Sequence, residues 1–264
     1  MQADLKAFAR CGVHGMTAIT AITAQSTVGV SAIHPLGGDV VIAQVRAVIE
    51  DIGVDAVKVG MLGTVEVTLA VARALDELPA GTPVVVDPVM VAESGARLLD
   101  AGAQDALVRE VLPRATVLTP NLWEARVLAG RDAAGEAEAG EEADEADEAD
   151  EAEILARELL ALGPRAVVVT GGHRTRAVDL YLAAGEGEPA VEIAGERHPD
   201  GAAHGSGCTH SSILAAQLAL GVAPLEAARR ARALTGEAVR NGLREVGEGA
   251  GPVDVFPLGR MGSL

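Results

Sequence analysis

The chain has 264 residues, of which 49% are hydrophobic, and a formal net charge of −17. This length suits one α/β domain, and we expect a single domain over residues 1–264. The acidity is local, because residues 133–153 hold 11 acidic residues and no basic one, which leaves 21 basic against 27 acidic residues elsewhere. That balance, together with only four aromatic residues, lacks the basic stacking surface of nucleic-acid binders and excludes that class.

No uninterrupted apolar run reaches the roughly 18 residues that a membrane span needs. The N-terminal stretch MQADLKAFARCG lacks the charged-then-apolar order of a secretory signal. We therefore predict a cytoplasmic protein without a membrane partner. The two cysteines, Cys11 and Cys208, lie far apart in dissimilar contexts, which predicts reduced thiols rather than a disulfide framework and excludes a metal site built on cysteine pairs.

Short apolar segments alternate with longer helical patterns along the chain. Strands are predicted at 16–25, 56–61, 83–89, 115–120 and 166–172, and helices between them at 38–52, 64–77, 102–112, 121–129 and 152–163. The acidic run 133–153 is predicted to be a solvated, frayed helical insertion between the last two of these helices. Two edge strands within 178–184 and 190–195 and two helices at 207–220 and 223–241 complete the pattern. This order indicates an α/β fold whose mainly parallel sheet is covered on both faces.

Polar and glycine residues gather where the predicted strands end. These residues are Gln25, Gly60–Met61, Asp87, Thr119–Asn121 and Gly171–His173. In a parallel sheet, ligands bind at the carboxyl ends of the strands. Each position alone is also typical of ordinary turns, but five together predict the rim of a binding pocket.

The stretch HGSGCTHSSILAAQLALG, residues 204–221, places small polar residues in front of an apolar helix. A helix N-terminus presents unpaired N–H groups and a partial positive charge, and glycines beside it let an anion approach the backbone. We therefore predict an anion hole at residues 205–209. The simpler interpretation, a Ser or Thr N-cap, explains Ser206 or Thr209 but not the flanking glycines. The chain has neither a GxxxxGK[ST] phosphate loop nor a GxGxxG dinucleotide motif.

Eight ordered segments resemble one enzyme family. They are QADLKAFARCGVHG, ITAITAQSTVGV, VKVGMLG, VVDPVMVAESGARLL, LTPNLWEARVLAG, VVVTGGH, HGSGCTHSS and GAGPVDVF. In this order and spacing they are similar to the hydroxymethylpyrimidine/phosphomethylpyrimidine kinases of thiamine biosynthesis, within the ribokinase-like superfamily. The resemblance covers nearly the whole chain apart from the acidic insertion.

The resemblance implies a ribokinase-like three-layer α/β/α sandwich, a homodimer, and two ATP- and Mg²⁺-dependent phosphoryl transfers. The first is to the hydroxymethyl group of 4-amino-5-hydroxymethyl-2-methylpyrimidine, and the second is to the resulting monophosphate. The resemblance also implies a role for individual positions. The pyrimidine is assigned to Gln25, Asp4, Met61 and Val89, and the nucleotide to Asn121, Glu124, Thr170, Gly172 and Ser206. Mg²⁺ is assigned to Glu124 and Asp87, and the centre of phosphoryl transfer to Gly205, Ser206, Gly207 and Cys208.

Cys208 is the candidate base of this scheme, with a structural role as the rival interpretation. A helix N-terminus lowers the pKa of a thiol, which favours the base. Each of the other assignments also has a plain alternative. Gln25 suits a strand-end turn and Met61 a core position, whereas Glu124 suits the first turn of a helix and Asp87 a turn before proline.

The chain departs from the family pattern in three places. Relatives begin with a strand and a glycine-rich loop before the segment that matches QADLK, so we expect an in-frame extension upstream of Met1. Relatives also commonly have lysine where this chain has Glu93 and Thr170. Loss of a lysine near bound phosphates weakens charge neutralisation, so these two positions predict weaker ATP binding.

Two rival functions stay open on the sequence alone. A pyridoxal or pyridoxine kinase of the same superfamily takes another small ring with a hydroxymethyl group, although Gln25 and Met61 favour the pyrimidine. A non-catalytic relative that binds a pyrimidine or nucleotide is the second rival, supported by the absent loop and Glu93. An oxidoreductase is excluded because no dinucleotide motif follows an early strand.

Overall fold

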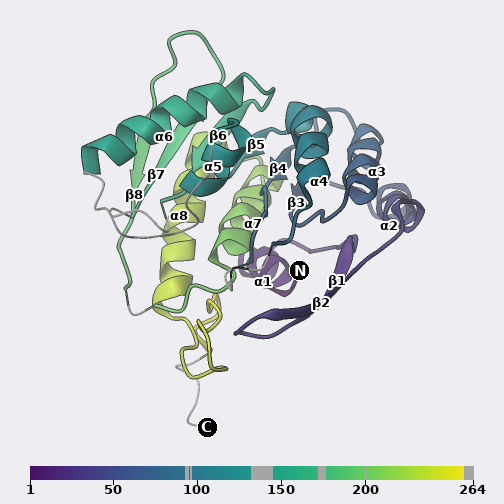
Figure 1. Cartoon of the computed structure of the whole chain (residues 1–264), viewed down its shortest axis with the longest axis horizontal. Coiled ribbons are helices and arrows are strands. Elements are labelled where there is room, and N and C mark those ends of the chain that lie inside the picture. Colours follow the sequence, from purple (N-terminus) through teal and green to yellow (C-terminus); the bar gives the residue numbers. More distant parts are fainter. Residues whose placement is uncertain (93–94, 96, 132–144, 172–176, 200, 259–264) are drawn as a thin grey trace.

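The computed structural model describes residues 1–92, 95, 97–131, 145–171, 177–199 and 201–258. A six-stranded sheet with the order β3-β4-β5-β6-β7-β8 forms the middle of three layers (Figure 1). The strands are β3 (Val57–Val59), β4 (Val84–Val86), β5 (Val117–Leu118), β6 (Ala166–Val169), β7 (Val178–Ala183) and β8 (Val191–Ala194). The pairings from β3 to β6 are parallel, and β7 and β8 add antiparallel strands at one edge.

The short central strands are apolar throughout because both of their faces are covered. Successive side chains in a strand point to opposite faces. Val84 and Val86 therefore pack into one hydrophobic core, while Val85 packs into the other. A strand buried on both faces reads as a continuous apolar run such as PVVVDPV, and the prediction of a mainly parallel α/β sheet is confirmed.

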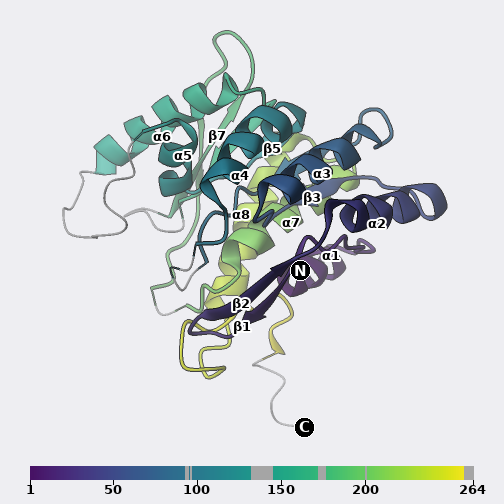
Figure 2. The same cartoon turned by 45° about the vertical axis from the view of Figure 1, so that its right-hand side comes forward.

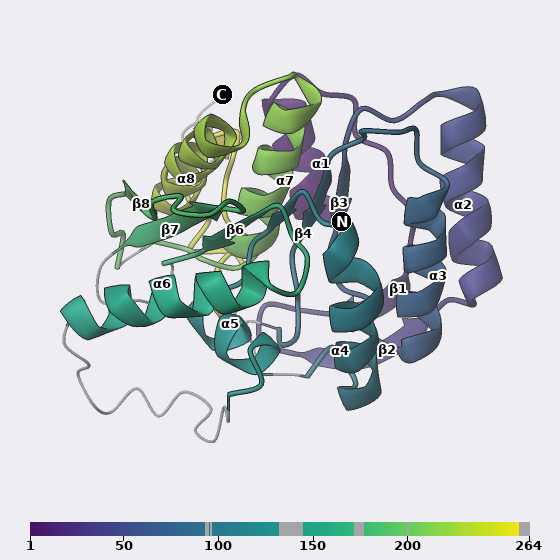
Figure 3. The same cartoon turned by 90° about the horizontal axis from the view of Figure 1, so that it is seen from above.

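Helices cover the two faces of the sheet unequally (Figure 3). One face carries α2 (Gly38–Asp51), α3 (Val65–Asp76), α4 (Ala101–Ala106), α5 (Leu122–Leu128) and α6 (Glu145–Leu160). The other carries α1 (Gln2–Arg10), α7 (Ser206–Ala219) and α8 (Pro224–Arg240). After α4 the chain continues as the π-helical turn η1 (Leu107–Val111) and the 3-10 turn η2 (Leu112–Arg114), where Pro113 cannot donate a helical hydrogen bond. No helix among the described residues is long and apolar enough to cross a membrane.

The predicted strand 16–25 does not join the central sheet, so that expectation was wrong. Its second half is β1 (Ala21–Gln25), which pairs antiparallel with β2 (Val30–Pro35), a strand that the sequence analysis missed. This hairpin stands apart from the central sheet (Figure 2). Most of its side chains are exposed, and its mixed sequence AITAQ lacks the continuous apolar character of a central strand.

The acidic run contributes to a packed helix. Positions 133–144 lie outside the described residues, but α6 begins at Glu145, seven residues before the predicted start. Arg126 of α5 forms a bidentate ion pair with Glu151 of α6, at 2.7 and 2.6 Å. Ala152 is fully buried. The last part of the run, 145–153, is therefore held to the domain by an ion pair and by an apolar face rather than frayed.

Candidate active site

The carboxyl ends of the parallel strands lie side by side. The Asp87 N–H donates to the Val59 carbonyl at 2.9 Å, and the Thr119 N–H donates to the Val86 carbonyl at 2.9 Å. The Thr170 N–H donates to the Pro120 carbonyl at 2.8 Å. Backbone pairing therefore continues past the ends of the strands and collects the polar residues that follow β3, β4, β5 and β6 along one edge of the sheet.

Helix α7 begins at this edge with unpaired amides. Its N-cap is Gly205, whose φ of 83° suits glycine, and no side chain in the described part of the chain caps the helix. The Ser206 N–H donates to the Ala203 carbonyl at 2.9 Å, so this amide is already occupied. The amides of Gly207 and Cys208 have no hydrogen-bond partner within the described part of the chain. The predicted anion hole therefore narrows to these two donors, because a turn uses the Ser206 amide.

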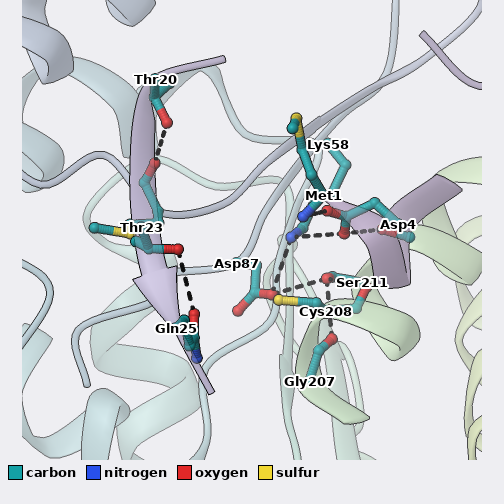
Figure 4. Close-up of polar contacts among 12 residues, drawn as sticks. Met1, Asp4, Thr20, Thr23, Gln25, Lys58, Asp87, Gly207, Cys208 and Ser211 are labelled. Carbon is teal, nitrogen blue, oxygen red and sulfur yellow. Dashed lines mark hydrogen bonds and ion pairs between the residues drawn. The ribbon is translucent and has the colours of Figure 1, made fainter. Parts of the chain in front are cut away.

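A buried ionic cluster adjoins the start of α7 (Figure 4). The Lys58 ammonium of β3 lies 3.1 Å from Asp4 Oδ1 and 3.4 Å from Asp87 Oδ2. The Ser211 hydroxyl donates to Asp87 Oδ2 at 2.9 Å, and the Ser212 hydroxyl donates to Asp4 Oδ1 at 2.6 Å. Two serines of α7 thus fix the helix to carboxylates from α1 and from the end of β4.

Lys58 stays charged although its side chain is only 5% exposed. Burial lowers the pKa of an ammonium, but attraction to the Cys208 sulfur in its deprotonated form and to the carboxylates of Asp87 and Asp4 outweighs burial and raises the pKa of Lys58. For the Asp4 carboxyl, burial acts in the opposite direction and raises the pKa. Lys58 and the N-terminal amine outweigh burial, so the pKa of Asp4 is lowered. The cluster therefore places a fixed positive charge between two carboxylates.

Cys208 lies beside this cluster, and its electrostatics differ from the prediction. The Lys58 ammonium lowers the pKa of the thiol most strongly, but burial and the carboxylates of Asp87 and Asp4 together raise it to about 11. The prediction of a lowered pKa was wrong because it considered the helix N-terminus alone. In the ligand-free protein Cys208 is a neutral thiol at pH 7.

Asn121 and Glu124 bind each other at the start of α5. Asn121 Oδ1 accepts from the Glu124 N–H at 2.8 Å, and Glu124 Oε2 accepts from the Asn121 N–H at 2.9 Å. This is a capping box, which gives both residues a local structural role. Burial and the nearby Asp87 nevertheless raise the pKa of Glu124 to about 8. No group of three His, Cys, Asp or Glu residues in the described chain is arranged to hold a metal ion.

The residues assigned to the pyrimidine come from the hairpin and the sheet edge. Gln25 is exposed at the end of β1, where Thr23 Oγ1 donates to its Oε1 at 3.5 Å. The Thr20 hydroxyl donates to the Met61 carbonyl at 2.7 Å and so joins the hairpin to the end of β3 (Figure 4). Met61 is half-buried, so it is not a closed core position, and Val89, two residues after Asp87, is half-buried as well.

The residues assigned to the nucleotide lie beyond β5 and β6. Thr170 forms an isolated parallel bridge with Asn121, which places the ends of these strands next to each other. Gly172 and His173 of the predicted rim, like Glu93, lie outside the described residues. Ser206 is part of the turn that begins α7.

Sequence reasoning missed Lys58, which joins Asp4 to Asp87. A signal was present, since Lys58 is one of two lysines in the chain and interrupts the otherwise apolar segment AVKVGM. It also missed Ser211 and Ser212, whose partners are 124 and 208 residues away in the sequence. Only the folded chain brings these groups together.

The fold and the site together define a small-molecule kinase of the ribokinase-like α/β/α class. The model of the phosphomethylpyrimidine kinase family matches residues 1–254, and the chain belongs to this family. It is 43% identical to the hydroxymethylpyrimidine/phosphomethylpyrimidine kinase of Rhizobium meliloti over 97% of this chain and 91% of that protein.

Two solved structures support the same class. The phosphomethylpyrimidine kinase of Clostridium difficile aligns with a TM-score of 0.73 at 34% identity, covering 90% of this chain and 92% of that one. The pyridoxal kinase of Staphylococcus aureus in complex with AMP-PCP and pyridoxal aligns with a TM-score of 0.79 at 32% identity, covering 99% and 89%.

Proposed function

We propose that this protein transfers the γ-phosphoryl group of ATP to the hydroxymethyl group of 4-amino-5-hydroxymethyl-2-methylpyrimidine, and then a second phosphoryl group to the monophosphate. One observation carries the proposal: the Gly207 and Cys208 amides, which have no hydrogen-bond partner among the described residues, lie beside the buried Asp4–Lys58–Asp87 cluster. Family membership and the relative from Rhizobium meliloti, whose name gives both activities, support it.

Phosphoryl transfer needs alignment and charge stabilisation more than covalent help from the protein. The substrate hydroxyl oxygen attacks the γ-phosphorus, the bond to the β–γ bridging oxygen breaks, and ADP leaves. The hydroxyl proton passes to an oxygen of the transferred phosphoryl group. The amides of Gly207 and Cys208 donate to the equatorial oxygens of the group in transfer. Lys58 provides a fixed positive charge at the same place.

Cys208 is proposed to contact the attacking hydroxyl. The pKa of Cys208, about 11, favours a structural role over that of a base. In the structural role a neutral thiol holds the hydroxyl in line with the γ-phosphorus. Early removal of the hydroxyl proton contributes little when the transition state is loose, so a thiolate is not required for the transfer. Gln25, Asp4, Met61 and Val89 are proposed to hold the pyrimidine ring.

Asp87 and Glu124 are proposed to hold Mg²⁺. Carboxylate oxygens are ligands that suit this cation. Burial and repulsion from Asp87 raise the pKa of Glu124, and a cation bound between the two carboxylates would relieve this repulsion. One Glu124 oxygen already accepts from the Asn121 amide, so contact through water fits better than direct ligation. When bound, Mg²⁺ neutralises charge on the nucleotide phosphates. Asn121, Thr170, Gly172 and Ser206 are proposed to contact the nucleotide.

Pyridoxal is the second candidate substrate. The observation in its favour is that a pyridoxal kinase of Staphylococcus aureus in complex with pyridoxal aligns with a TM-score of 0.80, above the 0.73 of the phosphomethylpyrimidine kinase. The higher identity to the pyrimidine kinase of Rhizobium meliloti, 43% against 32%, favours the pyrimidine.

The test compares turnover of the pyrimidine alcohol, its monophosphate and pyridoxal by the purified protein with ATP and Mg²⁺. We expect kcat/KM for the pyrimidine alcohol to exceed that for pyridoxal by at least about tenfold, which corresponds to about 1.4 kcal/mol of transition-state discrimination. A preference for pyridoxal would replace the proposed substrate. ATP binding without any product would leave only the non-catalytic alternative.

A homodimer and a cytoplasmic location also stay proposals. The exposed apolar side chains Ile22 and Val28 on the β1–β2 hairpin, at 56% and 60% exposure, support association. Light scattering at micromolar concentration tests it, and a mass near 26.8 kDa would contradict the dimer.

A further inference from the structure

A second buried ionic cluster lies behind the site and has no role in the chemistry described so far. Asp179 of β7 is 0% exposed. Its Oδ2 lies 3.1 Å from His210 Nε2 of α7, and its Oδ1 lies 3.8 Å from Arg232 Nη1 of α8. Asp179 Oδ1 also accepts from the Gly171 N–H at 2.9 Å. One carboxylate thus joins two helices to the backbone that follows β6.

The contacts of this cluster reach both Gly171 and Ala177. Asp179 holds the Gly171 amide, and the Arg232 guanidinium donates to the Ala177 carbonyl, so positions 171 and 177 are both attached to the cluster. His210 lies two residues after Cys208 in the same helix. The cluster therefore connects the chain beside Thr170, on the nucleotide side, with the start of α7.

Sheet stability alone does not explain a charge at position 179. Tyr181 and Ile193 supply apolar packing on the same face of the sheet as Asp179, and an apolar residue at a fully buried site is often at least as stable as an ion pair. Burial raises the pKa of Asp179, but His210, Arg232 and the Gly171 amide outweigh it and lower the pKa. Among the described residues, the Asp179 carboxylate accepts a backbone hydrogen bond from the Gly171 N–H. No side chain fits at Gly171, because its Cβ would lie 2.1 Å from the Val178 carbonyl oxygen.

We propose that Asp179 is a positioning residue that fixes the Gly171 backbone, at the nucleotide end of the site, relative to the N-terminus of α7 through His210. The inference rests on the proposed function, because it takes this end of the site to bind ATP. Asp179 itself touches neither substrate. Its removal therefore weakens nucleotide binding and leaves pyrimidine binding unchanged.

The experiment compares Asp179→Ala with Asp179→Asn. The alanine variant loses the acceptor for the Gly171 amide, whereas asparagine keeps an oxygen there. We expect Asp179→Ala to raise KM for ATP, and Kd for AMP-PCP measured by calorimetry, at least about tenfold, the factor typical of losing a hydrogen bond to a charged group. Asp179→Asn restores most of this loss. KM for the pyrimidine stays within about twofold in both variants, the margin of a contact that is not touched.

Leu159→Ala is the matched control. Leu159 is fully buried in α6, in the core on the opposite face of the sheet, so its truncation lowers the melting temperature without touching the cluster. Loss of stability alone reduces the active fraction and leaves KM for ATP unchanged. If Asp179→Ala behaves like Leu159→Ala, with AMP-PCP affinity within about twofold of wild type, the proposal is wrong.

His210→Ala provides a second variant should Asp179→Ala fail to fold. It removes the connection to α7 and is expected to weaken AMP-PCP binding in the same direction, and unchanged affinity would overturn the proposal. The binding measurement needs no pyrimidine. If wild-type protein binds AMP-PCP but phosphorylates only pyridoxal, the proposed substrate is wrong and the proposed role of Asp179 is unaffected. If the variants bind AMP-PCP as wild type does while wild type phosphorylates the pyrimidine, the role of Asp179 is wrong and the proposed substrate is unaffected.

Discussion

Lys58 provides one buried cation for two carboxylates inside the domain, those of Asp4 and Asp87. Removal of the ammonium would break both of these buried ion pairs, and breaking a buried ion pair typically costs about 3–5 kcal/mol. The space for the ammonium is provided by Gly60, where an added Cβ would lie 2.8 Å from Lys58 Nζ. Glycine two residues after the lysine therefore lets the side chain turn toward both carboxylates.

Gly60→Ala is expected to displace the Lys58 ammonium while the fold is retained, because the end of a lysine side chain moves easily. The pKa of Cys208 then rises further above about 11, since Lys58 is the strongest influence that lowers it. Alkylation of Cys208 by iodoacetamide at pH 9 becomes slower, and kcat falls about tenfold, equivalent to about 1.4 kcal/mol. Peptide mass spectrometry with kinetics measures both.

Lys58→Met removes the ammonium altogether, so its effect on Cys208 is expected to be larger. Labelling of the half-buried Cys11 in the same sample serves as the internal reference. Slower labelling at Cys208 but not at Cys11 supports the electrostatic role. Equal labelling of Cys208 in wild type and Lys58→Met would show that the ammonium does not control the thiol.

For single residues, the sequence predicted which residues belong to the site better than it predicted their electrostatic surroundings. Asp4, Asp87 and Cys208 were singled out by family resemblance, and the structure brings them to one cluster. The pKa of Cys208 was predicted in the wrong direction, because a helix end is visible in the sequence while two carboxylates 121 and 204 residues earlier are not. Long-range pairing also hid Lys58.

At the scale of elements, α5 shows how one pair of residues serves local structure and the site together. The pattern Asn121-x-x-Glu124 is readable as a capping box from the sequence, because a side-chain acceptor precedes a glutamate by three residues. Most predicted elements were found within a few residues for the same kind of local reason. The β1–β2 pairing was not found, since register between exposed strands carries little sequence signal.

Glu124→Gln is expected to change the pH dependence of stability. The folded pKa of Glu124, about 8, lies above the value near 4.3 typical of an unfolded chain. The native state therefore holds this proton while the unfolded state has lost it, and the free energy of unfolding falls as pH rises from about 4.3 to about 8. Glutamine keeps the capping box but carries no charge, so this fall, of order 5 kcal/mol, disappears.

Urea unfolding at intervals between pH 5 and pH 9 measures the effect as the difference between variant and wild type. The exposed Glu50→Gln on α2 controls for the loss of one negative charge. Profiles of wild type and Glu124→Gln that run parallel across this range would contradict a raised pKa at Glu124.

For the whole molecule, the site depends on both helical layers of the sheet. Asp4 and Cys208 come from the layer that contains α1, α7 and α8, whereas Asn121 and Glu124 come from the opposite layer. The sheet edge between the layers supplies Lys58 and Asp87. The site is therefore assembled only when both cores form, which makes activity a sensitive reporter of global folding.

Residues 133–153 hold 11 of the 38 acidic residues behind the net charge of −17, and replacement of the part of this run that precedes α6 is the corresponding whole-molecule prediction. We expect replacement of residues 133–144 by about six Gly and Ser residues to leave kcat and both KM values within about twofold, because α5 and α6 are already joined through Arg126 and Glu151. Shortening a connection of this size changes the free energy of unfolding by less than about 1 kcal/mol.

The matched control keeps the full length and replaces the acidic residues of 133–144 by Gln and Asn, which separates charge from length. Assays at about 0.15 M salt, where screening acts over about 8 Å, limit any general repulsion of ATP. If the shortened protein loses activity while the neutralised one keeps it, the length of the segment matters to the site. If both lose activity, the carboxylates themselves take part, and the acidic run is a functional element rather than an insertion.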